Sequence, residues 1–421
     1  MFERPRSGER AILVHLELGP AFAHDATEEL RELALSAGAE PLALVVGKRR
    51  VPDPRLFVGK GKAVEVKAKV EELGAELVIV NHQLSPSQER NLEAAVGCRV
   101  VDRVGLILDI FAQRARTHEG KLQVELAQLK HVATRLRGGW THLSRQKSAI
   151  GMRGPGETQL ETDRRLIKVR IATLTERLAK VQRSRDTGRR ARERVPVPVV
   201  AMVGYTNAGK STLFNALTSA TVYAADQLFA TLDPTVRRAA WPDAPHLALA
   251  DTVGFISHLP HELVAAFRAT LTEVREADLL LHVVDAVEAG RDGRIATVDA
   301  VLEEIGAHQV PRLVVMNKID LTGGRPRVEC DGEGRARAAW VSARTGLGLE
   351  LLAEAIVARA CPDLEERWLT LPPTAGAARA ELYQRGAVRR EEQLPDGGFR
   401  LQVRLPAREL DALAEAAEAM R

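Results

Sequence analysis

The chain has 421 residues, which at ~100 to 200 residues per domain corresponds to two to four domains. Apolar residues make up 45% and charged residues 28%, a balance that excludes a disordered chain, and no apolar run approaches the ~18 residues that cross a bilayer. The first residues lack a signal-peptide pattern, and the three cysteines have no disulfide-rich or zinc-binding spacing. We therefore expect a cytoplasmic protein with no membrane insertion, disulfide or structural zinc.

The net charge of +4 is distributed unevenly along the chain. Residues 135–194 contain 17 Lys and Arg against 6 Asp and Glu, so this segment carries +11 and the remainder carries −7. A basic block on an otherwise acidic chain predicts a phosphate-rich partner. Charge alone leaves open the alternative that the block is a solvated helix face.

Residues 1–101 alternate short apolar runs with helical stretches, which predicts a small α/β domain with a parallel sheet. The apolar runs are Ile12–Leu18, Pro41–Val46, Glu76–Val80 and Cys98–Val101, and the helical stretches include Asp25–Ser36 and Lys62–Leu73. Within this region Gly59-Lys60-Gly61-Lys62 opens a helix and could hold a phosphate. We favour a turn without a ligand, because neither a Walker nor a dinucleotide spacing accompanies it.

Residues 102–194 predict a long antiparallel helical hairpin. The first helix is expected over 102–137, where Leu122, Leu126 and Leu129 recur at intervals of three and four, and the second begins near Glu157. The segment between them, 138–156, is rich in Gly, Arg and polar residues and has little to bury. We expect this tip to contact a partner.

The rest of the chain predicts two further domains. After a linker at Val195–Pro198, strands and helices alternate through 195–361. Residues 362–421 contain a hairpin signal at Leu394–Phe399 and an Ala- and Glu-rich segment from Ala407, which together predict a small α+β domain.

A nucleotide-binding loop is the strongest chemical signal. The apolar strand from Val199 runs into the GxxxxGK[ST] pattern and then into a helix, the context that a P-loop requires. Glycines are needed there because a Cβ would block the approach of the backbone to phosphate. Lys210 is expected on the β- and γ-phosphates and Ser211 on Mg²⁺. The loop consists of Gly204, Tyr205, Thr206, Asn207, Ala208, Gly209, Lys210, Ser211 and Thr212.

Three further motifs follow predicted strands, where an open α/β sheet binds its ligands. The carboxylate of Asp251 can hold Mg²⁺ through water, and the Gly254 amide can contact the γ-phosphate. The Asp320 carboxylate can accept hydrogen bonds from the N1 and N2 donors, which guanine has and adenine lacks together. A backbone amide of the third motif can meet guanine O6. The three motifs are Asp251, Thr252, Val253 and Gly254; Asn317, Lys318, Ile319 and Asp320; and Ser342, Ala343 and Arg344.

The segment Phe229, Ala230, Thr231, Leu232 and Asp233 lies where the first switch loop of a GTPase is expected. Thr231 is the preferred Mg²⁺ and γ-phosphate ligand over Thr235, which we expect to start a strand. Phe255 follows the second motif, at the position where Ras-like GTPases carry the Gln that orients water. Slow intrinsic hydrolysis is therefore expected. Asp285 is interpreted as a strand-end cap or Arg partner, and the eleven histidines form no metal-binding pattern.

Over nearly its whole length the chain resembles GTPases of the HflX family, in the Obg/HflX superfamily. The segments that carry the resemblance are Phe57–Lys62, Leu84–Arg90, Val101–Val104, Gly154–Arg165, the P-loop, Phe229–Thr235, Asp251–Phe255, Asn317–Asp320 and Ser342–Arg344. The resemblance implies binding to the large ribosomal subunit, with the hairpin reaching rRNA near the peptidyl-transferase centre through residues 135–194. It also implies splitting of stalled or idle ribosomes under stress, with GTP hydrolysis stimulated by ribosomes and a monomer off the ribosome.

Two alternatives remain beside the ribosome-associated GTPase. One is an interaction protein whose hairpin docks another protein or a second copy, with nucleotide acting as a ligand. The other, an RNA-modification GTPase, lacks a supporting cysteine or cofactor constellation. The P-loop itself resembles that of the tRNA-modification GTPase MnmE, in which an Asn at the position of Asn207 holds a potassium ion. This implies K⁺ as an additional cofactor candidate beside Mg²⁺, while hydrogen bonding of Asn207 within the loop, for example to the strand end at Asn317, is the alternative.

Overall fold

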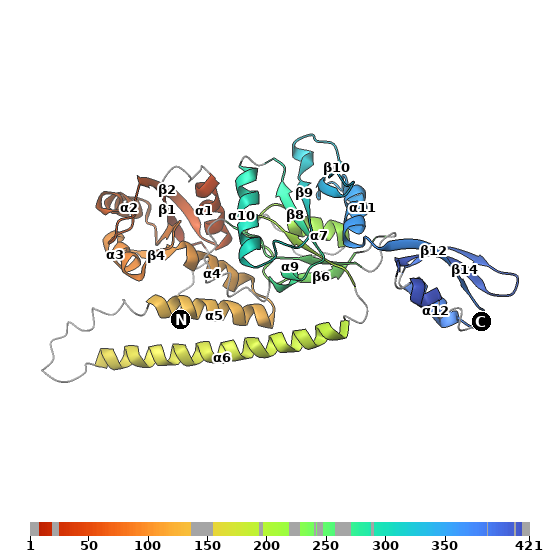
Figure 1. Cartoon of the computed structure of the whole chain (residues 1–421). Helices are drawn as coiled ribbons and strands as arrows, with labels where there is room; N and C mark the ends of the chain where they lie inside the picture. Colours follow the sequence, from red (N-terminus) through yellow and green to blue (C-terminus); the bar gives the residue numbers. More distant parts are fainter. Residues whose placement is uncertain are drawn as a thin grey trace. The chain divides into compact units, whose positions relative to one another are not determined.

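The computed structural model describes residues 8–18, 25–135, 155–192, 197–218, 228–239, 241, 247–256, 271–287, 290–384, 386–407 and 410–414. Figure 1 follows the chain through its elements. Two compact units form: the first comprises Met1–Arg189, Ala225–Asp233 and His258–Thr270, and the second comprises Arg190–Ala224, Pro234–Ser257 and Leu271–Arg421. None of the helices in the described ranges has the length and apolar composition to cross a membrane.

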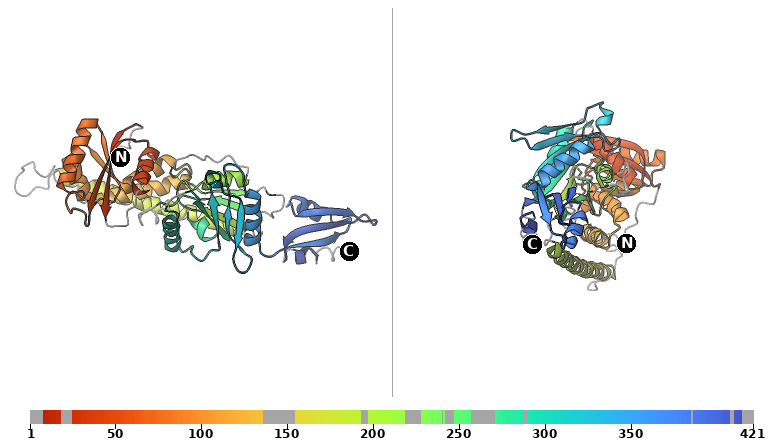
Figure 2. Two further views of the ribbon diagram at one scale, coloured as in Figure 1. Left: turned by 90° about the horizontal axis from the view of Figure 1, so that it is seen from above. Right: turned by 90° about the vertical axis from the view of Figure 1, so that its right-hand side faces the viewer.

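The first unit is built on a parallel sheet with the strand order β2-β1-β3-β4. Its strands are β1 (Arg10–Leu18), β2 (Glu40–Arg49), β3 (Leu77–Val80) and β4 (Arg99–Asp102). Helices α2 (Lys60–Leu73) and α3 (Pro86–Val96) lie on one face, and α1 (Asp25–Ser36) and α4 (Arg103–Arg114) on the other (Figures 1 and 2). The α/β architecture predicted for this region is confirmed, because the β3 strand is buried on both faces as a central parallel strand requires.

Local sequence signals explain the helix boundaries in this sheet. Ser85 and Gln88 form a reciprocal capping box at the start of α3, with Pro86 in the first turn. Gly97 ends α3 in the left-handed conformation, and Gly74 ends α2 in the same way. Gly59 precedes α2 with φ 85°, so the Gly59–Lys62 segment does open a helix as predicted.

The single helix predicted over 102–137 is wrong. The structure has two helices there, α4 and α5 (His118–Arg135), with an interruption at Ala115–Thr117. Asp102 caps α4 by accepting a hydrogen bond from the Gly105 amide. Ala115 then leaves the helical conformation with φ −61° and ψ 113°. The apolar periodicity continues across this interruption and therefore hides it from the sequence.

Helix α6 (Pro155–Arg192) packs on α5. A small apolar cluster joins them, with Leu122 and Leu126 from α5 and Leu174 from α6. Arg170 of α6 also forms an ion pair with Glu125 of α5 at 2.6 Å. The predicted hairpin tip, including Arg153 and Gly154, lies outside the described residues.

The second unit contains a seven-stranded sheet with the order β10-β11-β9-β8-β5-β7-β6. Its inner strands are parallel, and the edge strands β10 and β6 are antiparallel to their neighbours. The strands are β5 (Val199–Val203), β6 (Thr235–Arg238), β7 (Ala248–Asp251), β8 (Leu279–Asp285), β9 (Arg312–Asn317), β10 (Arg327–Cys330) and β11 (Ala336–Trp340). The helices are α7 (Lys210–Thr218), α9 (Thr272–Arg275), α10 (Arg291–Glu304) and α11 (Leu349–Ala360), with a short 3₁₀ turn at Ile319–Leu321. The core lies between sheet and helices and contains Phe214, Leu281 and Ile356.

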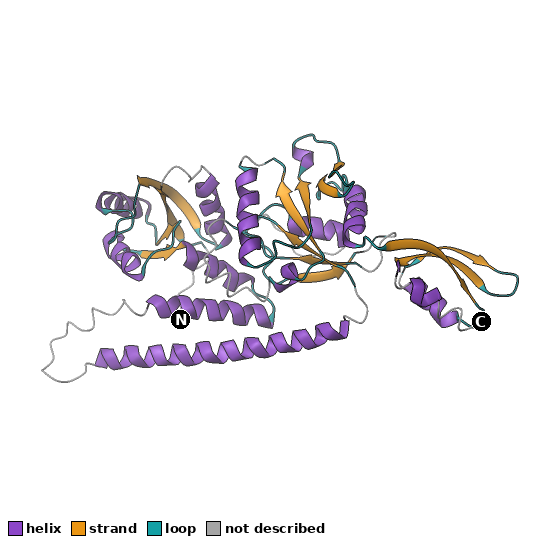
Figure 3. Cartoon of the chain, viewed as in Figure 1, coloured by secondary structure: helices purple, strands orange, loops and turns teal. Residues whose placement is uncertain are grey.

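A three-stranded antiparallel sheet follows, with the order β12-β14-β13. Its strands are β12 (Leu364–Leu371), β13 (Val388–Gln393) and β14 (Phe399–Pro406), and helix α12 (Gly376–Gln384) lies beside them (Figure 3). This sheet has its own apolar core, in which Leu382, Leu401 and Val403 are buried. Ala407 and residues 410–414 are helical, and the remainder of the helix predicted from Ala407 lies outside the described part.

Candidate nucleotide-binding site

The loop between β5 and α7 has the backbone that a phosphate-binding loop needs. A Cβ at Gly204 would lie 2.2 Å from the carbonyl oxygen of Val283, so only glycine fits against β8. Gly209 has φ 90° and Asn207 has φ 60°, both in the left-handed region. Such conformations turn successive amides toward one concave side, which attracts anions. The Asn207 side chain is exposed.

Lys210 is the first residue of α7, and its side chain points back toward the P-loop. Its Nζ donates to the carbonyl oxygens of Gly204 at 3.1 Å and Tyr205 at 2.7 Å. Burial lowers the pKa of Lys210 to about 8, with the negative charge of Asp251 acting in the opposite direction. The protein thus holds a desolvated lysine at the loop, where a bound phosphate would favour its charged form.

Ser211 and Asp251 bring two oxygen ligands together. The Ser211 Oγ donates to Asp251 Oδ2 at 2.7 Å, and Asp251 is fully buried at the end of β7. A hydroxyl and a carboxylate suit Mg²⁺, which usually takes one or two protein oxygens and completes its shell with phosphates and water. Among the described residues, no group of three or more His, Cys, Asp and Glu side chains could hold a metal ion by itself. The residues present therefore fit a substrate-bound Mg²⁺.

The segment after Asp251 lies against the P-loop. Tyr205 and Phe255 form a parallel β-bridge, with the Thr206 amide donating to the Phe255 carbonyl at 2.8 Å. A Cβ at Gly254 would lie 2.8 Å from the Thr206 side chain and 3.0 Å from the Lys210 Nζ. Phe255 is 3% exposed, so its ring belongs to the core. Thr252 anchors the segment to β5, since its hydroxyl donates to the Met202 carbonyl.

Asn317 connects the P-loop to the region predicted to bind the base. Its Nδ2 donates to the Ala208 carbonyl at 3.0 Å, and its Oδ1 accepts from the Ala343 amide at 2.9 Å. Three residues further on, Asp320 Oδ1 is buried and has no hydrogen-bond partner among the described residues. An orphaned carboxylate oxygen is costly and indicates a missing donor, which the guanine edge would supply.

The remaining residues of these motifs are mostly structural. Lys318 adopts φ 66° and forms an ion pair with Asp285 at 2.8 Å. Asp285 also accepts from the Val287 amide, so its strand-end role holds, but its partner is a lysine and not an arginine. Ile319 is 1% and Val253 is 7% exposed, both within the core.

The Ser342 loop brings its amides to the end of β9. Ser342 is fully buried, and its Oγ accepts from the Thr345 amide at 3.2 Å. Arg344 is exposed. Sequence reasoning missed the guanidinium of Arg294, which stacks over the Tyr205 ring at 4.6 Å. Its position in α10, 89 residues beyond Tyr205, carries no motif that could have revealed it.

One predicted segment is grouped with the first unit. Residues Ala225–Asp233, which include Phe229, Ala230, Thr231 and Leu232, group with the first unit. Thr235 begins β6, as expected. The P-loop, Asp251–Gly254, Asn317–Asp320 and Ser342–Arg344 all belong to the second unit, at the carboxyl ends of its parallel strands. This fold and site define a P-loop GTPase domain.

Comparison with known proteins agrees with that class. Residues 24–112 match the family described as GTP-binding GTPase N-terminal, residues 114–192 its middle region, and residues 199–318 the family described as 50S ribosome-binding GTPase. The GTPase HflX of Escherichia coli is 55% identical over 96% of both chains. The GTPase HflX of Caldanaerobacter subterraneus is 47% identical over 93% of this chain and 90% of its own. The chain belongs to the HflX family of GTPases.

Solved structures give a weaker likeness. A GTP-binding protein from Sulfolobus solfataricus in complex with GDP is 25% identical over 83% of this chain and 98% of its own, with a TM-score of 0.44. Era from Aquifex aeolicus, solved with GDP and an aluminium fluoride, is 23% identical over 39% of this chain and 57% of its own, with a TM-score of 0.32.

Proposed function

We propose that this GTPase selects guanine nucleotides through Asp320 and hydrolyses GTP at the P-loop of the second unit. The observation that carries the proposal is the buried, unpartnered Asp320 Oδ1 beside Asn317, which is itself hydrogen-bonded to the P-loop. The P-loop amides receive the phosphates, and the Lys210 ammonium lies on the β- and γ-phosphate oxygens. Mg²⁺, held by Ser211, Asp251 and Thr231, would neutralise phosphate charge.

In this site the side chain at position 255 cannot orient the attacking water for hydrolysis. The buried Phe255 ring offers no hydrogen bond, although its backbone joins the P-loop. The Gly254 amide contacts the γ-phosphate as charge accumulates there, and Lys210 stabilises the charge on the leaving phosphate. We infer a slow intrinsic rate that a partner raises by ordering the switch segments.

The partner in this proposal is the large ribosomal subunit. Residues 135–194 would contact rRNA near the peptidyl-transferase centre, and GTP binding would split stalled or idle ribosomes under stress. The +11 charge of this segment supports an RNA partner, as do exposed basic side chains on α6 such as Arg165, Lys168 and Arg177. The matching family description, 50S ribosome-binding GTPase, points the same way. The protein would act in the cytoplasm, as a monomer off the ribosome.

Four functional regions follow from this proposal. Residues 1–101 form an N-terminal α/β domain, 102–194 the ribosome-contacting hairpin, 195–361 the GTPase domain and 362–421 a C-terminal α+β domain. The hairpin and the GTPase domain carry the RNA contact and the chemistry.

Co-sedimentation with ribosomal subunits tests the partner. We expect the full chain to bind large subunits with a non-hydrolysable GTP analogue, and binding to weaken steeply as salt rises. Replacing Arg153, Gly154 and Gly156 by alanine should abolish splitting in light scattering while GDP affinity stays unchanged. A control that removes Lys67 and Lys69, two lysines on α2, should split ribosomes normally. Undiminished splitting by the tip variant would refute the RNA-contacting role of the hairpin.

Potassium is a second element of the proposal. The Asn207 side chain is exposed in the P-loop, with φ 60°, and is available to place an amide oxygen near the phosphates. A monovalent cation there would neutralise charge that develops on the oxygen between the β- and γ-phosphates. An arginine finger stabilises the same charge in other GTPases. GTP turnover should be faster in K⁺ than in Na⁺ at matched ionic strength, and Asn207→Ala should remove the difference. Turnover indifferent to the cation, yet accelerated by ribosomes, would leave activation to the partner alone.

A further inference from the structure

The segment that carries Thr231 is held within the first unit. The Leu228 amide donates to the Ser36 Oγ at the end of α1, at 3.1 Å. Leu228, Phe229 and Leu232 are each 2% exposed. The Phe229 ring meets Phe111 of α4 edge to face, with centroids 4.7 Å apart. Apolar side chains therefore anchor this segment on both sides of Thr231.

Asp233 caps helix α5. One carboxylate oxygen accepts from the amides of Arg116 and Thr117, both at 2.8 Å, and the other accepts from the Thr117 hydroxyl. The Thr117 Oγ1 in turn accepts from the Gly120 amide at 2.9 Å. A helix start leaves its first amides without partners and favours negative charge. Asp233 is distant in the sequence, and its carboxylate acts as the N-terminal cap of α5.

Gly120 makes room for this cap. A Cβ at position 120 would lie 2.2 Å from Asp233 Oδ1. Glycine inside a helix is unfavourable because it leaves the backbone more conformational freedom to lose on folding. Its presence in the first turn of α5 is explained by the approach of the Asp233 carboxylate.

The cap is placed where it can be released. Arg116 and Thr117 are exposed, so water can replace Asp233 at their amides. Phe229 has φ 55°, a left-handed conformation that is strained for an aromatic residue and is maintained here by its burial against Phe111. Backbone strain of this kind is typical of segments that switch between conformations.

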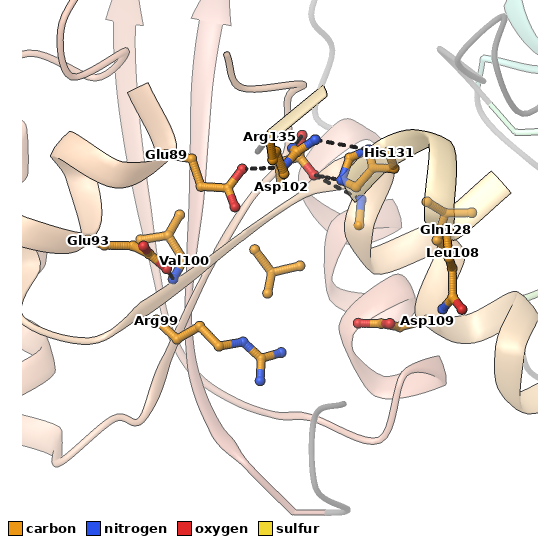
Figure 4. Close-up of a pocket in the computed structure, with 12 residues that line it drawn as sticks. Glu89, Glu93, Arg99, Val100, Asp102, Leu108, Asp109, Gln128, His131 and Arg135 are labelled. Carbon is orange, nitrogen blue, oxygen red and sulfur yellow. Dashed lines mark hydrogen bonds and ion pairs between the residues drawn. The ribbon is translucent and has the colours of Figure 1, made fainter. Parts of the chain in front are cut away.

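The other end of α5 is fixed independently. Arg135 forms ion pairs with Glu89 at 2.7 Å and with Asp102 at 2.8 Å, and its guanidinium also contacts His131 (Figure 4). These residues line a cavity of about 320 Å³ beside β4. Loss of the Asp233 cap would therefore loosen the first turn of α5 and leave its last turn attached.

We propose that Asp233 is a nucleotide-sensitive latch on α5, an inference that rests on the proposed binding of Thr231 to the nucleotide. Thr231 and Asp233 are two residues apart, a span of at most ~7 Å. Capture of Thr231 by the γ-phosphate and Mg²⁺ withdraws Asp233 from the amides of Arg116 and Thr117. The first turn of α5, next to Leu122 in the contact with α6, then loosens. GTP binding thereby changes the stability of α5 at its contact with α6.

Hydrogen exchange of the full chain tests the latch without ribosomes. We expect the amides of residues 116–120 to exchange at least ~5-fold faster with a non-hydrolysable GTP analogue than with GDP. Amides in the last turn of α5 should exchange equally in both states. Equal or slower exchange of residues 116–120 with the GTP analogue overturns the proposal.

Two variants remove the latch by different routes. Asp233→Ala deletes the carboxylate, and Gly120→Ala displaces it by steric contact while leaving Asp233 intact. Both should show fast exchange at residues 116–120 with either nucleotide. Asp331→Ala is the matched control, because Asp331 accepts from the amides of Glu333 and Arg335 in a turn of the second unit. A GDP-to-GTP difference that survives in both latch variants contradicts the assignment.

Thr231→Ala separates failure of the latch from failure of the underlying function. If Thr231 binds the nucleotide, this variant should bind the GTP analogue more weakly in Mg²⁺ while binding GDP normally. An unchanged affinity for the analogue refutes the Thr231 role itself. A weakened affinity combined with nucleotide-independent exchange at residues 116–120 in the wild type refutes the latch alone.

Discussion

Gly209 and Asn317 approach so closely that a Cβ at position 209 would lie 2.3 Å from the Asn317 Nδ2. The same amide group donates to the carbonyl of Ala208, so the P-loop and the end of β9 support one another. Asn317 also accepts from the Ala343 amide, which brings the third motif into the same network. The P-loop, the end of β9 and the Ser342 loop are therefore coupled through one side chain.

Gly209→Ala should weaken GDP binding. The added methyl group displaces Asn317 and leaves the Ala208 carbonyl and the Ala343 amide without their partner, at ~2 kcal/mol or more, or ~30-fold in affinity. Calorimetric titration with GDP measures the effect. Gly332→Ala is the control, because a Cβ there meets no atom within 4 Å. Equal affinities in both variants would show that the coupling through Asn317 is unimportant.

Asp320→Asn should change the base preference. One acceptor becomes a donor facing a guanine donor, which costs ~3 kcal/mol or ~100-fold in GDP affinity and favours xanthine nucleotides. Competition between GDP and xanthosine diphosphate reports the change. Asp292→Asn, at a side chain that is 92% exposed, should leave the preference unaltered. Retention of full GDP affinity by Asp320→Asn would remove the guanine assignment.

GDP affinity should depend on pH through Lys210. Burial lowers the pKa of this ammonium to about 8 without nucleotide, whereas bound phosphate favours the charged form and raises the pKa. Affinity should therefore be constant below pH ~8 and fall up to ~tenfold per unit above it. Titrations between pH ~7 and ~9 measure this. Lys210→Met should bind weakly with a flat profile, and a flat profile in the wild type would disprove the desolvated lysine.

His131 should make the first unit sensitive to acid. Burial lowers its pKa to about 4, an effect to which Arg135 contributes and which Asp102 opposes. The unfolded chain, with an ordinary His pKa of ~6.5, takes up a proton that the folded chain excludes. Stability should fall as pH drops from ~6.5 toward 4, by ~2 kcal/mol from this residue at pH ~5.

Scanning calorimetry at pH 7 and pH 5 checks that effect. The loss of Tm on acidification should be smaller in His131→Gln than in the wild type. The exposed His308, replaced by Gln, should show the wild-type loss. An identical acid response in all three proteins would argue against a buried neutral His131.

The helix interruption at Ala115–Thr117 could not be predicted from the sequence. The apolar residues of α4 and α5 follow one continuous helical period, so the hydrophobic pattern does not mark the interruption. The carboxylate that caps α5 comes from Asp233, 116 residues beyond Thr117. Because that contact is long-range, the period of the sequence could not reveal it. Gly120 was the one local sign, and it is interpretable only with Asp233 in place.

Most of the sheet in each unit, by contrast, followed from local chemistry. The β3 strand is an apolar run between Glu76 and Asn81, and the β5 strand is one between Pro198 and Gly204; short apolar runs with such boundaries favour buried parallel strands. The P-loop residues Gly204–Ser211 could be named from spacing alone, since the glycines, the lysine and the hydroxyl serve the phosphates from one short segment.

The sequence by itself determined the class of site, because phosphate binding needs a loop whose amides, glycines and Lys210 are consecutive. Tertiary structure decided how the other groups are held. Ser211 and Asp251 meet across 40 residues, and Asn317 and Ala343 across 26, only because parallel strands end at one edge of the sheet. The grouping of Ala225–Asp233 with the first unit was decided by packing against Phe111 and by capping of α5. Such contacts depend on shape and on unpaired backbone groups, which no local pattern encodes.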